Sequence, residues 1–361
     1  MTGKARIGIL GGGGIVGAHA AGYHANLDRA QVIAVAEPRP ECADRLRELF
    51  GNDVRIEADY RDVIAADDID AVDIVLPHDL HMPATIAAAE AGKPVLVEKV
   101  MARNVYECDR MIEACDRAGV SLTVCHDRRY HGQWMALKQI VDSGVLGEIF
   151  WWKLDHNQNV VGPEGHWLRS RDRLGGGAIM SCLTHQIDSL RWYGGEVQSL
   201  ACMTKTKPER MEGEFAGVII AQMKSGALAH LAINWWTTSN ASENGLWYEM
   251  VQVCGTKGEA YYMSGRGTFL KLHTPADSET PWQYEMESTG GFSRVKSGDW
   301  VGHVRCIGEW IKSVRGEPAD LYTDGRAVRG TVEVAEAAYL AEATGCTVTL
   351  PIEPKPWPGT V

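Results

Sequence analysis

The sequence of 361 residues lacks the features that assign a chain to several specialised classes of protein. No apolar run reaches the length of a transmembrane helix, and no Lys/Arg cluster offers a basic surface to nucleic acid. The formal net charge of −11 also argues against a nucleic-acid partner. The nine cysteines include no C-x-x-C pair, which favours reduced thiols. Met1 to Lys4 leads directly into a strand-like segment, so we expect no signal peptide and a cytoplasmic protein.

Tryptophan is absent from the first 133 residues, and all 12 tryptophans lie at or after Trp134. A chain of this length usually needs more than one hydrophobic core, so we expect two domains. The change in composition places their boundary near residue 126. We therefore predict domains at 1–126 and 127–361.

Glycines at the start of the chain form the first motif. Arg6 to Leu10 reads as a buried strand, and Gly12, Gly14 and Gly17 then fit G-x-G-x-x-G before a predicted helix. In a dinucleotide-binding turn the first glycine permits the tight turn, the second admits a pyrophosphate and the third allows close packing of helix and strand. Amides at the helix start, here those of Ile15 and Val16, favour phosphate charge. A simple strand-to-helix corner also explains such glycines.

An acidic residue in the next strand favours nucleotide binding. Residues 31–36 read as a second buried strand, and Glu37 follows it, 20 residues beyond Gly17. A dinucleotide-binding fold places its ribose-binding acid near this position. We expect Glu37 to accept hydrogen bonds from the adenosine ribose and to favour NAD over NADP. Arg39 complicates this expectation, because its guanidinium can pair with a 2′-phosphate.

Strands and helices alternate through the first domain. Residues 71–76, 95–97 and 120–124 read as buried strands, and the segments between them have helical patterns. This alternation predicts a doubly wound parallel sheet, in which ligands bind beyond the carboxyl ends of the strands. Glu37, Pro77, His78, Glu98 and Lys99 lie at such ends.

The second domain contains long strand-like runs. Hairpin turns are predicted at 224–226 and 256–258, and a linking helix at 133–143. The pattern predicts a large, mainly antiparallel open sheet in an α+β domain, with strands at 148–157, 197–206, 215–223, 227–236, 248–254 and 259–263. An open sheet with so many apolar residues needs a cover, so we expect a homodimer or homotetramer through this sheet.

One helix of the second domain, predicted at 178–193, carries a polar row. At about 100° per residue, Ser181, His185 and Asp188 fall on one face. Met180, Leu183, Ile187 and Leu190 form a separate apolar stripe. A solvated helix face is the alternative to a functional one.

Together these segments resemble the glucose–fructose oxidoreductase/inositol dehydrogenase (Gfo/Idh/MocA) family over essentially the whole chain. The resemblance rests on the order of several motifs: Gly12, Gly14 and Gly17; 70–77 followed by His81; 91–99 ending in Glu98-Lys99; Arg128-Arg129-Tyr130; 144–149; Gly175-Gly176-Gly177 with His185 and Asp188; and 255–258.

The resemblance implies an N-terminal Rossmann domain, a C-terminal domain with an open sheet and a nicotinamide cofactor between them. It implies hydride transfer to or from a carbinol of a sugar, glycoside or cyclitol. Lys99 and His185 match the family's lysine and acid/base positions, His81 lies in the loop beside the cofactor, and Asp188 is a third catalytic candidate. A glycoside-cleaving enzyme that uses transient oxidation by bound NAD, and a non-catalytic nucleotide sensor, are alternatives.

The chemistry of carbinol oxidation asks for such residues independently. Hydride leaves carbon only as the hydroxyl loses a proton, and histidine titrates near neutrality, which suits a base at this oxygen. A lysine ammonium can stabilise the alkoxide or, if desolvated, act as the base. Two residues depart from the family pattern. Val100 replaces the usual proline after Lys99, and Ser181 stands where many relatives carry aspartate.

The remaining candidates complete the predicted site. We expect no metal site at the pair His78 and His81, because the site lacks obvious carboxylate or cysteine companions and the family pattern places His81 in the loop beside the cofactor. A sugar ring suits a mixture of aromatic and polar side chains. The expected substrate-binding residues are Lys99, Arg128, Tyr130, Asp155, His156, His166, Trp167, Ser181 and His185.

Overall fold

The computed structural model describes residues 3–160, 162–237, 248–273, 284–289 and 291–358. The chain contacts divide it into two compact units. Unit 1 contains residues 1–130, 300–332 and 354–361, and unit 2 contains residues 131–299 and 333–353. The predicted boundary at residue 126 is thus close to the point where the chain first passes from unit 1 to unit 2, between residues 130 and 131. The prediction of a single second domain over 127–361 is wrong, because the chain returns to unit 1 near its end.

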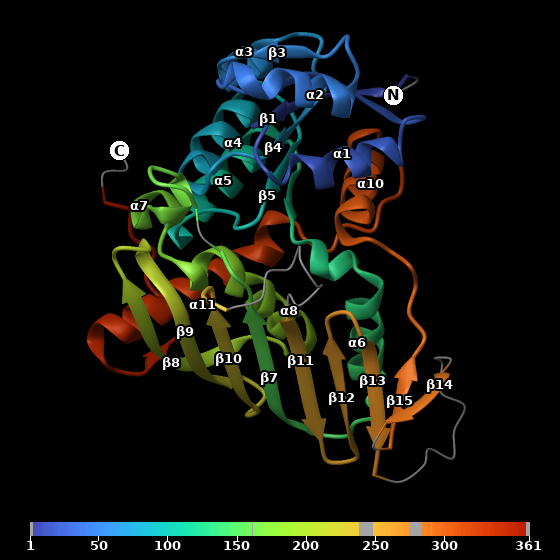
Figure 1. The fold of residues 1–361 in the computed structure, drawn as a ribbon, viewed down its shortest axis with the longest axis vertical. Coiled ribbons are helices and arrows are strands. Elements are labelled where there is room, and N and C mark those ends of the chain that lie inside the picture. The colour runs from blue at the N-terminus through green and yellow to red at the C-terminus, as the bar shows by residue number, and fades with distance from the viewer. Residues whose placement is uncertain (1–2, 161, 238–247, 274–283, 290, 359–361) are drawn as a thin grey trace. The chain divides into compact units, whose positions relative to one another are not determined.

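Unit 1 is a doubly wound α/β unit, as the alternating pattern predicts (Figure 1). Its six parallel strands follow the order β3-β2-β1-β4-β5-β6. The strands are β1 Ala5–Leu10, β2 Ala30–Ala36, β3 Arg55–Glu57, β4 Ala71–Ile74, β5 Val95–Glu98 and β6 Leu122–Cys125. The helices are α1 Val16–His24, η1 Pro40–Cys42, α2 Ala43–Phe50, α3 Tyr60–Ala65, η2 His78–Leu80, α4 His81–Glu90, α5 Val105–Ala118, η3 Asp127–Tyr130 and α10 Gly302–Val314.

Helix α10 explains why the late segment belongs to unit 1. It packs against α1, and its Ile307, Trp310 and Ile311 are fully buried in the core that surrounds β1 and β2. The two helices approach closely at Gly22, where a Cβ atom would lie 2.6 Å from Ile307 Cδ1. Burying these side chains contributes about 1.5–3 kcal/mol each, so this contact stabilises α10 within unit 1.

Unit 2 is built on a ten-stranded mixed sheet in the order β14-β15-β13-β12-β11-β7-β10-β9-β8-β16. All the described pairs except β7 with β10 are antiparallel. Its strands are β7 Ile149–Asn157, β8 Val197–Lys207, β9 Met211–Met223, β10 Leu228–Asn234, β11 Tyr248–Gly255, β12 Gly258–Met263, β13 Gly267–Leu272, β14 Tyr284–Thr289, β15 Phe292–Val295 and β16 Val348–Thr349. Its helices are α6 Gly132–Asp142, η4 Trp167–Arg169, α7 Arg171–Leu174, the π-helix η5 Ile179–Leu183 and α8 Thr184–Gly194, and α11 Gly325–Thr344 runs from unit 1 into unit 2.

The large sheet has one covered and one open face. Along β9, buried residues alternate with exposed Val218, Ile220 and Gln222, as expected when one face packs and the other meets solvent. Helices α6 and α8 contact the packed face. In the part of the chain that the structure describes, no helix is both long and apolar enough to cross a membrane.

Candidate functional site

The glycine turn lies between β1 and α1, as predicted, but its glycines have different roles from those expected. The tight turn is at Gly11, which has a φ of 110° and whose Cβ would lie 2.4 Å from the Val75 carbonyl oxygen. Gly12 instead admits Glu37, whose Oε2 would be 2.9 Å from a Cβ. The close packing expected at Gly17 is wrong, because Gly17 is exposed and its Cβ would meet nothing within 4 Å. Gly14 and Ile15 are exposed before buried Val16, so the start of α1 is accessible to an anion.

Glu37 follows β2 directly, and its carboxylate is tightly bonded. Gly12 N donates to Oε2 at 3.0 Å, and the Arg39 guanidinium donates to both carboxylate oxygens at 2.7 and 2.9 Å. Burial opposes ionisation of Glu37, but these hydrogen bonds outweigh burial and lower its pKa. The Arg39 side chain remains about half exposed at 52%. Arg39 therefore partly neutralises the acid that sequence reasoning assigned to the ribose.

The buried side chain of His81 stabilises the loop after β4 through contacts with backbone carbonyl groups. Pro77 precedes η2, His78 is buried, and the ring of His81 is completely buried. Its two ring nitrogens lie 2.9 Å from Val100 O and 2.8 Å from Leu76 O. Burial lowers the pKa of His81. The prediction that His81 contacts cofactor is therefore wrong for its side chain, which ties this loop to the segment that follows Lys99.

Lys99 follows the last residue of β5 and is partly exposed. Its backbone N–H donates to Oε2 of Glu98 at 3.1 Å, so the carboxylate of one residue orients the backbone of the next. The Lys99–Val100 peptide is cis, and Val100 is fully buried. Lys99 is thus partly exposed, whereas its neighbours Glu98 and Val100 are buried.

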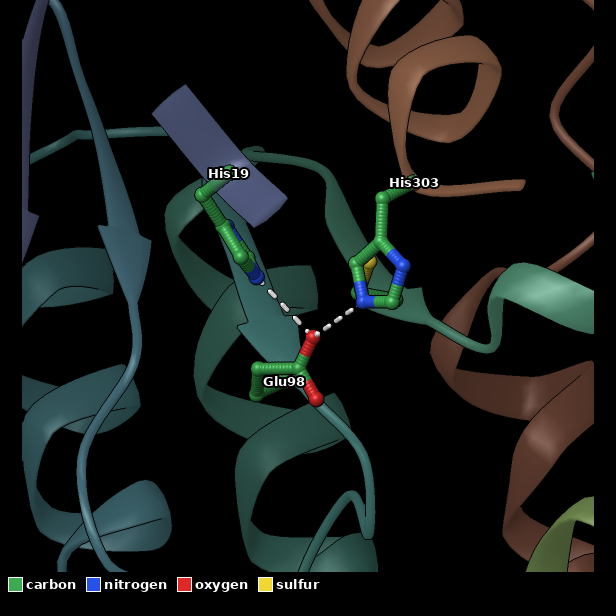
Figure 2. Close-up of side chains that lie close together, drawn as sticks. His19, Glu98 and His303 are labelled. Carbon is green, nitrogen blue, oxygen red and sulfur yellow. Dashed lines mark hydrogen bonds and ion pairs between the residues drawn. The ribbon is translucent and has the colours of Figure 1, made fainter. Parts of the chain in front are cut away.

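Glu98 is the centre of a buried polar cluster that sequence reasoning missed (Figure 2). Its Oε1 lies 2.9 Å from His19 Nε2 and 3.4 Å from His303 Nε2. Burial alone would lower the pKa of His19, but Asp73 and Glu98 raise it to about 10. Burial also opposes ionisation of Glu98, yet both histidines hold its pKa well below the usual range. Glu98 therefore faces the interior and not a cofactor, which corrects its predicted role. The position of Glu98 at the end of a predicted strand was the only sign of this cluster that we find in the sequence. No sequence motif connects Glu98 with His303.

Of the two candidates in η3, only Arg128 is accessible. Arg128 is partly exposed and pairs with Asp127 at 2.5 Å. Tyr130 is fully buried, and its hydroxyl accepts a hydrogen bond from Tyr322 N at 2.9 Å and lies 3.2 Å from Thr323 Oγ1. Burial raises the pKa of this phenol. The prediction that Tyr130 binds substrate is wrong, because the ring belongs to the core of unit 1.

The predicted helix of unit 2 is split into the π-helix η5 and the α-helix α8. Ser181 lies in η5, whereas His185 and Asp188 lie three residues apart on one side of α8. None of the three is more than 5% exposed. The solvated helix face considered as an alternative is therefore wrong, and so is a uniform 100° spacing through 178–193.

His156 and Asp155 are consecutive in β7 and point to opposite faces of the sheet. The buried His156 ring stacks on that of His185 with 6.1 Å between centroids, and its Nδ1 lies 3.1 Å from both Gln186 Oε1 and Glu249 Oε1. Asp155 instead pairs with Lys153 at 3.3 Å. The prediction that both residues line one site is wrong, and only His156 lies beside His185.

Two residues near His156 were not predicted. Gln186 follows His185 directly, and Glu249 lies opposite His156 in the pairing of β11 with β7. The adjacency of Gln186 was visible in the sequence, but the strand register that brings Glu249 here was not. The remaining candidates, His166 and Trp167, lie partly exposed at η4, where His166 Nδ1 accepts from Leu168 N at 3.3 Å.

Comparisons with known proteins agree with this architecture. The NAD-binding Rossmann-fold model of an oxidoreductase family matches residues 5–126, and the GFO/IDH/MocA C-terminal domain model matches residues 134–261. Inositol 2-dehydrogenase of Klebsiella pneumoniae (strain 342) is 32% identical, over 52% of this chain and 53% of its own length. The chain thus aligns with about half the length of that relative. Inositol 2-dehydrogenase of Streptomyces avermitilis is 27% identical, over 97% of this chain and 95% of its own.

Among solved structures, the WlbA dehydrogenase of Bordetella pertussis in complex with NADH and UDP-GlcNAcA is similar with a TM-score of 0.80. The two are 25% identical over 97% of this chain and all of the other. The two family models meet close to the crossing from unit 1 to unit 2 and together cover about two thirds of the chain. The chain therefore belongs to the Gfo/Idh/MocA family of oxidoreductases, with an NAD-binding Rossmann fold at its N-terminus.

Proposed function

We propose that this protein is an NAD-dependent dehydrogenase that transfers hydride to or from a carbinol carbon of a sugar, glycoside or cyclitol. The observation that carries the proposal is the partly exposed Lys99 at the carboxyl end of β5. The glycine turn after β1 and Glu37 after β2 lie at the same edge of the parallel sheet. Ligands of doubly wound sheets bind at this edge. The relatives that are named as inositol dehydrogenases support the substrate class.

The glycine turn fits the cofactor that the family implies. Gly14 leaves room for a phosphate beside the backbone, and the first amides of α1 supply partial positive charge. When NAD is bound, its nicotinamide supplies the hydride acceptor. The contribution of the chain is to hold the pyrophosphate at α1 and the adenosine ribose near Glu37 and Arg39.

The proposal assigns the proton to His185 and the stabilisation of the alkoxide to Lys99. An imidazole can take the hydroxyl proton near neutral pH, and a nearby ammonium lowers the free energy of the negative oxygen. His156 stacks on His185 and contacts Gln186 and Glu249. We therefore propose that His156 orients the ring of His185. Asp188, three residues along α8, favours the protonated imidazole. Arg128, His166, Trp167 and Ser181 remain proposed contacts of the substrate.

A panel of polyols, sugars and glycosides with NAD and NADP tests the function through the absorbance of reduced nicotinamide. We expect net reduction of NAD by at least one polyol or sugar. Lys99→Met and His185→Asn should keep cofactor affinity and lose on the order of 10²–10⁴ in kcat. Glycoside cleavage without net NADH release would replace this function by the transient-oxidation route. NAD binding without turnover of any compound would favour a sensor.

We further propose that the protein is a cytoplasmic homo-oligomer that associates through the open face of its large sheet. Met203 is 81% exposed and Ile220 61% exposed, and Val218 and Leu228 lie on neighbouring strands. Large exposed apolar patches typically mark contact surfaces. All nine cysteines are free thiols, which suits a reducing compartment.

A further inference from the structure

Four side chains from distant parts of the chain converge inside unit 1. His19 comes from α1, Glu98 from the end of β5, Cys125 from the end of β6 and His303 from the first turn of α10. One nitrogen, oxygen or sulfur atom of each lies within 4.8 Å of the corresponding atom of every other. Figure 2 shows both imidazole rings directed at one carboxylate oxygen of Glu98. The first three residues are buried, and the His303 side chain is 19% exposed.

The hydrogen-bonding capacity of these groups shows what the cluster needs. His19 Nδ1 lies 2.7 Å from Asp73 Oδ2, and His303 Nδ1 lies 3.4 Å from Asp127 Oδ2. An ionised carboxylate only accepts, so each Nδ1 carries a proton. In a neutral imidazole the opposite nitrogen then presents a lone pair. Both Nε2 atoms face Glu98 Oε1, which is also an acceptor, so a positive centre must lie among these three atoms.

That positive centre is either a second proton on each imidazole or one metal ion. Asp73, Glu98 and Asp127 bring three carboxylates to the cluster, and one divalent ion carries the same two positive charges as the two added protons. In metal sites, a ligating histidine commonly donates its other ring N–H to a carboxylate. Both histidines here have that second carboxylate, and Tyr23 O–H fixes Asp73 Oδ2 at 2.8 Å.

The chemistry of the four donor atoms selects the kind of metal. Two imidazoles, a carboxylate and a thiol suit Zn²⁺, whereas Mg²⁺ and Ca²⁺ prefer oxygen ligands only. Zinc bonds of about 2.0–2.3 Å in a tetrahedron separate the ligand atoms by roughly 3.3–3.8 Å. The distance of 3.4 Å between His303 Nε2 and Glu98 Oε1 already falls in this range. The distance of 2.9 Å between His19 and Glu98 needs to lengthen by about half an ångström.

We propose that unit 1 binds one zinc ion through His19 Nε2, Glu98 Oε1, Cys125 Sγ and His303 Nε2. Four protein ligands fill a tetrahedral shell, which is typical of structural zinc. The ion joins α1 and α10 to the carboxyl ends of β5 and β6. It therefore links residues 300–332 to residues 1–130 within unit 1. The partly exposed ring of His303 gives the ion a route of entry.

Metal analysis and cobalt substitution of the full-length protein test this site. Protein from zinc-supplemented medium should retain about one zinc per chain after dialysis. Replacement by Co²⁺ should give visible absorption bands of tetrahedral intensity and a thiolate-to-cobalt charge-transfer band. Cys125→Ser should lose the charge-transfer band, whereas Cys115→Ser, which removes another buried thiol of unit 1, should keep it. Asp73→Asn should weaken zinc affinity by about 10–100-fold.

The melting temperature of the wild-type protein provides a second test, which does not depend on any variant. A chelator should lower the melting temperature of wild type, and zinc should restore it, because a ligand of the native state stabilises it. Wild type that holds no zinc, gives no tetrahedral cobalt spectrum and melts identically with chelator would overturn the proposal and assign the positive centre to protons. A cobalt spectrum that survives in Cys125→Ser without change would also overturn the proposed ligand set.

Discussion

At the scale of single residues, Glu37 and Arg39 decide the choice of cofactor. Arg39 is held by a charged, bidentate pair and is half exposed. Glu37→Ala releases this guanidinium and removes the charge that repels a 2′-phosphate. Because a hydrogen bond to a charged group contributes about 1.5–3 kcal/mol, the ratio of kcat/KM for NADP to that for NAD should rise by roughly 10–100-fold.

The double variant Glu37→Ala/Arg39→Ala is the matched control for this prediction. It lacks the released guanidinium and should lose most of the gain with NADP. Kinetics with both cofactors measure the ratio for all three proteins. A wild type that already prefers NADP would show that Arg39 dominates and that Glu37 does not set the specificity.

Ser181 and Asp188 should contribute unequally to catalysis. Ser181 offers one neutral hydrogen bond from η5, whereas Asp188 carries a charge on the same helix as His185. Ser181→Ala should cost about 1 kcal/mol in kcat/KM, and Asp188→Asn should cost more, because it removes a charge that favours the protonated imidazole. The measurement is kcat/KM across pH, with thermal melts to confirm folding. A larger loss in Ser181→Ala would place the serine in the proton path.

At the scale of elements, Glu214 joins β9 to η5 and α11. Its Oε1 accepts from Ile179 N and from the Tyr339 hydroxyl, each at 2.8 Å. Burial raises the pKa of Glu214 from 4.5 to about 7. The folded state therefore keeps the proton while the unfolded state loses it, so stability falls as pH rises from about 4.5 to 7 and then levels off. A shift of this size corresponds to on the order of 3 kcal/mol.

Glu214→Gln should remove this part of the pH dependence, since an amide keeps an acceptor oxygen and carries no charge. We expect the variant to be more stable than wild type at pH 8 and nearly equal to it at pH 4.5. Urea unfolding at a series of pH values measures the difference. Glu212→Gln, an exposed change on the same strand, is the control. An equal pH dependence in wild type and Glu214→Gln would show that Glu214 ionises normally.

The same elements show what the sequence could and could not predict. Strands β8 to β12 were predicted from long strand-like runs and from the hairpin turns between them. The short strands β13 to β15, of 4–6 residues, were missed. The parallel pairing of β7 with β10 was also missed, because strand order depends on packing between distant segments.

The candidate site divides in a similar way. Motifs predicted Lys99 and Glu37 at strand ends and His185 on a helix, and the structure has Lys99 after β5, Glu37 after β2 and His185 in α8. They misassigned Tyr130 and Asp155, because burial and the face of a strand depend on partners elsewhere in the chain. The cluster around Glu98 was invisible for the same reason, as His303 lies more than 200 residues along the chain.

At the scale of the whole molecule, the open face of the large sheet should control assembly. Ile220 lies between Ala201 of β8 and His230 of β10, near the centre of the exposed apolar surface. A stable interface buries roughly 1,200–2,000 Å² in total, and a buried, unpaired lysine in it costs several kcal/mol. Ile220→Lys should therefore convert the oligomer to monomer without lowering the stability of the isolated chain.

Light scattering coupled to size-exclusion chromatography measures the mass of wild type and variant across a concentration series. Leu27→Lys is the matched control, because it makes the same kind of change at a residue of unit 1 that is 56% exposed. We expect this variant to keep the mass of wild type. Dissociation by Leu27→Lys but not by Ile220→Lys would place the interface on unit 1. A wild type that is monomeric at micromolar concentration would contradict the proposed interface. Chains associate only at concentrations above the dissociation constant, so the open face would then be exposed to solvent.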